Sequence, residues 1–338
     1  MTTMIQPLLD TFDPIELLTK DLKDAARMIT PTEARFLVDY YYIIQEDRKR
    51  TSNQKRALSE DEEPSLIIDW LVQNNTRFES SIKKALDVFS AAQEVGQWAR
   101  SILGVGPVIA SGLLAHIDMD KTPSIGALWR FAGYDPTSQW LGKEKAEALL
   151  KTYPGPITTE MIATIAQDRG LKYGTLLNGS LDDNGKPSRP KLIAALAKRP
   201  YNADLKVLCW KLGECFVYVS GNPDSLYGRI YRETKAREIA RNESGELAEQ
   251  AREKLERFKI GRDTEAYKHY SAGALPPAHI HARAKRRAIK IFLSHYWQVA
   301  YQVKWGVPAP DPWIIAHGGH QDLIPIPGWP MEEAKAPV

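Results

Sequence analysis

The residues best suited to bind an anion lie in one apolar stretch, residues 102–117. Two glycines there flank a valine, and Pro107 then begins an apolar run with helical spacing. Glycines permit a turn that needs a positive φ, so we expect Gly106→Val to disrupt this turn. Pro107 suits the first position of a helix. The outward N–H groups at that helix N-terminus would bind a phosphate, through Gly104, Val105, Gly106 and Val108.

This pattern predicts a helix-hairpin-helix that binds nucleic-acid backbone without distinguishing bases. The alternative is a buried glycine turn between two core helices, because the small residues Ala110, Ser111 and Gly112 also let helices pack closely. Both interpretations require two helices that meet at the turn.

A second candidate is a helix rich in Lys and Arg that starts near Pro276 and Pro277. Arg283, Arg286 or Arg287, and Lys290 recur at three- and four-residue spacing and share one face, without compensating acids. The opposite stripe consists of Ile280, Ala284, Ala288 and Ile291. Like charges on one helix face repel each other, whereas beside a phosphate backbone they gain counterion release. The helix therefore predicts nucleic-acid binding, with a solvated face as the alternative. Its candidate residues are Arg283, Lys285, Arg286, Arg287 and Lys290.

Other cations complete the predicted backbone-binding set. Residues 227–259 are expected to form a charged helix with a basic first half and a mixed second half that pairs along the helix. The additional candidates are Lys121, Arg130, Lys143, Lys145, Arg229, Arg232 and Lys235.

The residues after the hairpin resemble a known family. The hairpin, a short loop, Pro123-Ser124, the run from Leu128 to Gly133 and Pro136 resemble the C-terminal domain of insertion-sequence transposases guided by a bridge RNA. The segment is also similar to the Nop domain of box C/D small nucleolar RNP proteins, in which a Gly-x-Glu-Lys-Ala stretch follows, as residues 142–146 do here. Nop-like Tas proteins of tandem interspaced guide RNA (TIGR) systems, common in phages, resemble both the transposase domain and the Nop domain.

The chain departs from those transposases in its first hundred residues, and from this departure we expect a protein without a nuclease domain. The N-terminal nuclease of those transposases holds divalent metal on acidic residues carried by strands, and residues 1–100 show no alternating strand pattern. Their serine nucleophile follows the Ala-Gly-x-x-Pro turn. Ser138 lies slightly early, Trp140 stands in its place, and no general base is evident. No catalytic residue is therefore expected.

Three functions follow from these patterns. The resemblance favours a nuclease-free protein that holds a short guide RNA, with target DNA recognised by base pairing, and that forms a homodimer through residues 31–100. The second function is a transposase or recombinase that retains only its strand-transfer domain, with Ser138 as the nucleophile. The third is a structural or interaction protein of phage origin, with the hairpin as a core turn.

Composition sets the broad class. The chain has 338 residues, 43% of them hydrophobic, which is enough for more than one domain. Its net charge is only +3, so a basic surface must arise by local clustering. No signal peptide or membrane span is evident, and the spacing of Cys209 and Cys215 does not favour a disulfide. We expect a protein of the bacterial or archaeal cytoplasm. His317 and His320 lack further ligands, so neither metal nor cofactor is expected.

The elements that would position these residues are mostly α-helices. Thr30 or Thr32 caps a first long helix, and a second runs from Pro64 to about Arg100. The expected organisation is an N-terminal segment (1–30), an antiparallel helical pair (31–100), a helix-hairpin-helix or Nop-like core (101–155), a helical insertion (156–200), C-terminal core helices that include the basic helix (201–305), and a Pro- and Trp-rich tail (306–338). The pair either mediates dimerisation or forms an ordinary wall of the core.

Overall fold

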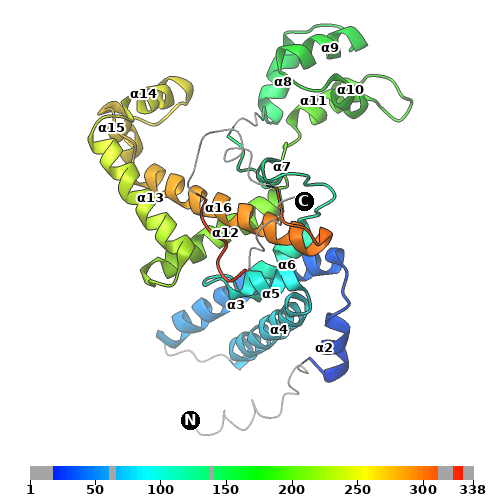
Figure 1. Ribbon diagram of the computed structural model, residues 1–338. Helices are drawn as coiled ribbons and strands as arrows, with labels where there is room; N and C mark the ends of the chain where they lie inside the picture. Colours follow the sequence, from blue (N-terminus) through cyan, green and yellow to red (C-terminus); the bar gives the residue numbers. More distant parts are fainter. Residues whose placement is uncertain (1–17, 61–65, 137–139, 311–322, 330–338) are drawn as a thin grey trace, which may run out of the picture. The chain divides into compact units, whose positions relative to one another are not determined.

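The computed structural model describes residues 18–60, 66–136, 140–310 and 323–329. These residues form α-helices joined by turns, and their only pairing of extended backbone is an isolated bridge between Leu181 and Pro187. The expected mostly α-helical class is thereby confirmed. The chain divides into two compact units, residues 129–206 and the remainder, each with its own core (Figure 1).

The first unit contains most of the helices. They are α2 (Lys20–Ala26), α3 (Pro31–Glu60), α4 (Leu66–Ala91), α5 (Glu94–Ser101), α6 (Pro107–His116), the 3₁₀ turn η2 (Val219–Gly221), α13 (Leu226–Glu243), α14 (Ala248–Arg257), α15 (Glu265–Ser271) and α16 (Pro277–Trp305). Two helices, α7 (Ile125–Phe131) and α12 (Ala203–Tyr218), cross the boundary between the units.

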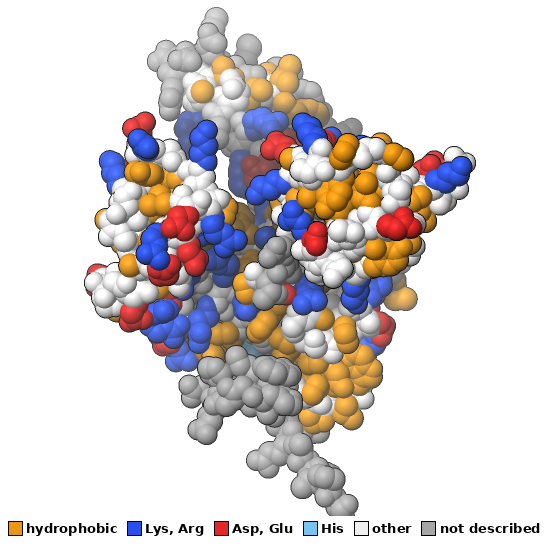
Figure 2. Space-filling model, turned by 90° about the horizontal axis from the view of Figure 1, so that it is seen from above, with side chains coloured by type: hydrophobic (Ala, Val, Ile, Leu, Met, Phe, Trp, Pro, Cys, Tyr) orange, Lys and Arg blue, Asp and Glu red, His pale blue; other side chains and the backbone are white. Residues whose placement is uncertain are grey.

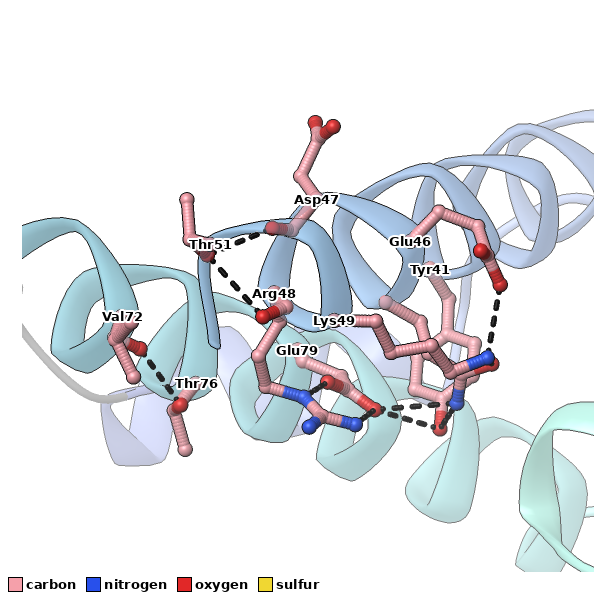
Figure 3. A network of polar contacts seen from close by, with 10 residues as sticks. Tyr41, Glu46, Asp47, Arg48, Lys49, Thr51, Val72, Thr76 and Glu79 are labelled. Carbon is pink, nitrogen blue, oxygen red and sulfur yellow. Dashed lines mark hydrogen bonds and ion pairs between the residues drawn. The ribbon is translucent and has the colours of Figure 1, made fainter. Parts of the chain in front are cut away.

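Helices α3 and α4 pack as the expected antiparallel pair. Of the two threonines, Thr30 caps α3: its Oγ1 accepts from the Glu33 amide at 3.2 Å, while Glu33 Oε2 accepts from the Thr30 amide at 2.7 Å. This reciprocal capping box satisfies two donors that the helix leaves unpaired. Between the helices, Glu79 of α4 forms an ion pair with Arg48 of α3 and accepts a hydrogen bond from Tyr41 at 3.1 Å (Figure 3).

The second helix of the pair is shorter than expected. It ends at Ala91, and α5 begins at Glu94, so a single helix through Arg100 is wrong. The turn brings Gly96 against the preceding helix end, where an added Cβ would lie 2.1 Å from the Ser90 carbonyl oxygen. The apolar pattern continues through this break because both helices pack on the same core, which hides the turn from a periodicity argument.

The charged segment at residues 227–259 is likewise two helices and not one. Helix α13 ends at Glu243, and Gly245, with φ of 82°, turns the chain into α14. Glycine just beyond a helix end is a common stop signal because it adopts positive φ without strain. Charged residues continue on both sides of Gly245, so charge alone does not indicate the break.

An aromatic core lies where α5, α12, α13 and α16 meet. Trp98 stacks on Phe292 with 5.7 Å between ring centroids, and Phe216 stacks on Tyr227 at 4.9 Å. The described part of the tail, residues 323–329, packs across these helices, because Trp98 Nε1 donates to the Pro327 carbonyl at 2.9 Å. This core holds α5, the helix that precedes the turn, against α16.

The second unit, residues 129–206, contains α8 (Lys143–Lys151), α9 (Thr159–Asp168), α10 (Tyr173–Ser180) and α11 (Arg189–Ala197). Thr158 Oγ1 accepts from the Met161 amide at 3.2 Å and caps α9. Arg189 donates to the carbonyls of Leu150 and Tyr153 at 2.7 and 2.8 Å, which ties the end of α8 to α11. The buried core of the second unit consists of Ala146, Leu150, Ile162, Ile165, Ala166, Leu176, Leu192 and Leu196.

Candidate nucleic-acid interface

The turn between α5 and α6 uses its two glycines differently. Gly104 has φ of 95°, and an added Cβ would lie 3.5 Å from the Cys215 carbonyl oxygen and 3.3 Å from Val219 Cγ2. Gly106 has φ of −89° and ψ of 175°, and an added Cβ would meet nothing within 4 Å. The expectation that Gly106→Val disrupts the turn is therefore wrong, because an extended residue before a proline tolerates valine.

Helix α6 is buried along its body and open at its start. Gly112 packs so closely on α12 that an added Cβ would lie 2.6 Å from a methyl group of Leu208. At the other end, Gly106 is exposed and provides no side-chain cap. The first amides of a helix have no acceptor within the helix, and Val108 and Ile109, which carry two of these amides, are largely buried but line the hollow beside this end of α6. Small residues thus serve close packing in the helix body, while the N-terminus stays accessible.

A hollow of about 370 Å³ lies beside this helix start. It contains two lysines, Lys83 of α4 and Lys211 of α12, and the exposed indole of Trp210. The Lys211 ammonium lies 3.5 Å from the ring centroid of Tyr42, and burial lowers its pKa. The described residues that line the hollow are Tyr41, Tyr42, Gln45, Lys83, Gly104, Gly106, Pro107, Val108, Ile109, Trp210, Lys211, Glu214 and Cys215.

A larger hollow of about 850 Å³ adjoins the first across the turn. The two share Gly104, Gly106, Glu214 and Cys215, so the turn forms a ridge between them. The second is lined further by Arg100, Ser101, Ile102, Leu103, Val105, Val217, Tyr218 and Val219. We call the two hollows together the turn groove. Val105 is buried at its base.

The polar wall of the turn groove is fixed by the α3–α4 interface. Tyr41 and Gln45 both donate to Glu79 Oε1, at 3.1 and 3.2 Å, next to the Arg48–Glu79 ion pair (Figure 3). Burial, followed by the nearby Glu79 charge, raises the pKa of Tyr41 to about 12. Tyr41 therefore stays neutral at physiological pH, and the charge of Glu79 is paired with Arg48 within the interface.

The basic helix, α16, begins at Pro277 as expected, but two of its cations have carboxylate partners. Arg283 forms an ion pair with Glu238 of α13 at 2.8 Å. Lys285 is buried and forms an ion pair with Glu214 of α12. The expectation of a helix without compensating acids is wrong for these residues, because the acids come from neighbouring helices that α16 packs against. Of the remaining predicted cations, Arg286 and Arg287 are exposed and Lys290 is half-buried.

The other predicted cations do not line the turn groove. Lys121 pairs with Asp118 at 3.0 Å and Arg229 with Glu233 at 3.8 Å, while Arg232 is exposed and Lys235 lies 6.0 Å from the Tyr231 ring centroid. In the second unit, Arg130 pairs with Asp135 at 3.1 Å, Lys143 lies 4.0 Å from Glu147, and Lys145 is exposed. Figure 2 likewise shows Lys and Arg side chains interspersed with acidic and apolar ones on the face it presents.

Sequence reasoning missed the aromatic and lysine residues of the turn groove. Trp210, Lys211 and Tyr218 lie on α12, which the sequence marks as apolar and inward-facing, yet Trp210 and Tyr218 are 53% and 91% exposed. Their eight-residue spacing places them on one side of a helix, which is a signal that could have been used. Tyr42 and Lys83 come from distant helices, so no local pattern groups them with the turn.

The remaining predicted positions lie outside the described residues or in the second unit. Ser138 and the pair His317 and His320 lie outside the described residues. Trp140 donates from Nε1 to the Ala197 carbonyl at 2.6 Å and lies beside the Arg199 guanidinium, so it joins α8 and α11 within the second unit. Among the described residues, no three His, Cys, Asp or Glu side chains come together as metal ligands, and none of the helices is long and apolar enough to span a membrane.

No family model, curated protein or solved structure matches this chain. The resemblance to Nop-like and bridge-RNA-guided proteins therefore stays an expectation from residues 102–146.

Proposed function

We propose that this chain is a nuclease-free, guide-RNA-binding protein that holds the RNA backbone at the turn groove. The observation that carries the proposal is the open N-terminus of α6, bordered by Lys83 and Lys211. Backbone amides at a helix start favour an anion. Two lysines that line the same hollow add positive charge where a phosphate would lie.

The electrostatics of the groove support an anionic ligand. Its acidic lining residue, Glu214, is engaged by the buried Lys285, and Arg100 is held in an ion pair with Asp87. Lys83 has no carboxylate partner among the described residues and is exposed. Each phosphate neutralised by a lysine contributes a slope of about −0.7 in log K against log salt for a single strand. The two lysines would therefore make binding clearly salt-dependent.

In this proposal the protein recognises backbone and shape, while base pairing between the RNA and a DNA target supplies sequence recognition. Proteins of RNA-guided systems divide the work in this way. The resemblance of residues 102–146 to Nop-like proteins supports this division of roles. Such a protein would act in the cytoplasm of a bacterial or archaeal cell, encoded by the host or by a phage.

The first test uses the open position at Gly106. Valine there fits the extended backbone and projects into the space beside the α6 amides. Loss of one charge-assisted hydrogen bond to phosphate weakens binding by about tenfold or more. Fluorescence polarisation with a labelled RNA at several KCl concentrations measures this loss. Gly174→Val, at an equally open glycine in the second unit, is the matched control.

A folded Gly106→Val protein that binds RNA as tightly as the wild type would refute the groove as the site. Sequencing of short RNA that co-purifies with the wild-type protein provides an independent check. A guide-binding protein retains one RNA population with a common fixed segment, whereas a structural protein retains none.

We further propose that the protein is a homodimer through residues 31–100. The outer face of α3 exposes Phe36 and Ile43, and the first half of α4 exposes Ile67, Trp70 and Phe78. Large apolar side chains at such density are typical of an interaction surface. Light scattering after gel filtration should give a dimer for the wild type and a monomer for Phe36→Ser with Ile67→Ser. Phe258→Ser, on an exposed side chain elsewhere, is the control; a monomeric wild type would contradict this proposal.

A further inference from the structure

Trp210 is an exposed tryptophan held in place by a buried charge. The Lys285 ammonium lies 5.0 Å from its ring centroid, and Lys285 itself is only 7% exposed. Glu214 holds that ammonium in an ion pair, and Gly213 makes room for the lysine stem, since an added Cβ there would lie 2.7 Å from Lys285 Cγ. One side of the indole is thus supported, while 53% of the residue remains exposed.

The supported indole lies at the edge of the hollow that contains Lys83, Lys211 and the start of α6. A phosphate alone needs the lysines and amides but gains nothing from an aromatic ring. A nucleotide offers both a phosphate and a flat base that stacks on an aromatic surface. The combination of cations with an exposed, fixed ring therefore distinguishes a nucleotide from a simple anion.

A second aromatic side chain continues the same line. Tyr218 is 91% exposed and lines the adjoining hollow, eight residues after Trp210 on α12. Eight residues of helix extend about 12 Å, which exceeds the spacing of about 3.4 Å between stacked neighbours in a duplex strand, so the two rings would contact different nucleotides. Bases inside a duplex are covered by their neighbours and cannot reach either ring, so the rings require unpaired nucleotides.

We propose that the turn groove takes an unpaired segment of nucleic acid, with one base stacked on the open face of Trp210 and its phosphate beside Lys211 and the α6 amides. This inference rests on the proposed function and deepens it, because it names single-stranded nucleotides as the ligand of the same site. Tyr218 stacks a second base of the same segment.

The test compares single strands with duplexes on the full-length protein. Fluorescence polarisation measures binding of labelled 12-nucleotide RNA and DNA strands and of the matching duplexes. We expect the single strands to bind more tightly than the duplexes. Trp210→Ala should weaken single-strand binding about thirtyfold, the middle of the range for loss of one stacked base, and Trp210→Phe should restore most of it. The RNA and DNA arms show which sugar the groove prefers.

Val207→Ala is the matched control, since Val207 is exposed on the same helix one turn earlier. A probe on the wild type avoids any folding defect of the variants: a strand carrying 2-aminopurine should lose fluorescence on binding, as a stacked base does. Equal binding of single strands and duplexes, an unaffected Trp210→Ala, or unchanged 2-aminopurine emission would overturn the stacking inference while leaving backbone binding intact. Absence of binding to every probe would overturn the proposed function itself.

Discussion

His295 on α16 should make folding stability depend on pH. The ring is buried, its Nδ1 lies 2.8 Å from the Tyr227 hydroxyl, and its Nε2 lies 3.0 Å from the Ile324 carbonyl oxygen. The carbonyl can only accept, so Nε2 carries the hydrogen and Nδ1 accepts from the tyrosine. Both contacts are thus satisfied by the neutral ring. Burial lowers the pKa from 6.5 to about 4, although the Ile324 hydrogen bond partly opposes the shift.

The sign of the effect follows from proton binding. Between pH 6.5 and pH 4 the unfolded chain binds a proton at this histidine and the folded chain does not, so stability falls as the pH is lowered through that window. One proton corresponds to about 1.4 kcal/mol per pH unit. Between pH 6.5 and 5, where most carboxylates remain ionised, His295 should therefore cost about 2 kcal/mol of unfolding free energy.

The assay is urea denaturation at half-unit pH steps, followed by tryptophan fluorescence, for wild type and His295→Gln. The variant loses buried hydrogen bonds and is less stable at pH 7. The comparison therefore uses the slope of the unfolding free energy against pH and not the unfolding free energy itself. Its slope between pH 6.5 and 5 should be shallower by about one proton. An unchanged slope in His295→Gln would refute the assignment of a neutral buried ring.

Three further predictions concern the turn and its supports. Gly104→Ala should destabilise the protein by about 1–2 kcal/mol because of the positive φ at Gly104 and its close contact with α12. Gly106→Ala should leave the melting temperature nearly unchanged. A larger loss of stability from Gly106→Ala than from Gly104→Ala would contradict the observed turn. Glu214→Gln leaves the buried Lys285 without its ion-pair partner and should lower the unfolding free energy by about 1–3 kcal/mol in chemical denaturation. This loss is smaller than that for a fully buried pair because Glu214 is partly exposed; full stability would show that the pair is dispensable. Arg286→Glu with Arg287→Glu should weaken RNA binding and flatten its salt dependence, measured by the same polarisation titrations, and unchanged binding would remove these two residues from the interface.

Local chemistry predicts the helices and the turn well but their mutual contacts poorly. Thr30 caps α3 and Pro277 starts α16 because capping and proline geometry depend on neighbours within one turn of chain. The break at residues 92–93 and the stop at Gly245 were missed, since apolar periodicity and charge continued through them. In each case the competing local signal was a glycine near the break.

The candidate site was predicted only in part, for a similar reason. The hairpin glycines stand next to each other in sequence, so their role in a turn could be inferred, but only φ distinguishes Gly104 from Gly106. The basic face of α16 could be inferred from spacing. The pairing of two of its cations with Glu238 and Glu214 could not be inferred, because both acids lie on other helices.

The sequence by itself determined an all-helical chain, a glycine turn ahead of Pro107 and a cationic α16, because each depends on residues within a few positions of one another. Tertiary structure alone decided that the start of α6 is open, that Lys83, Lys211 and Trp210 border it, and that Lys285 supports a ring instead of facing solvent. Those outcomes depend on which helices pack together, and residues far apart in the chain are brought into contact only when the core closes.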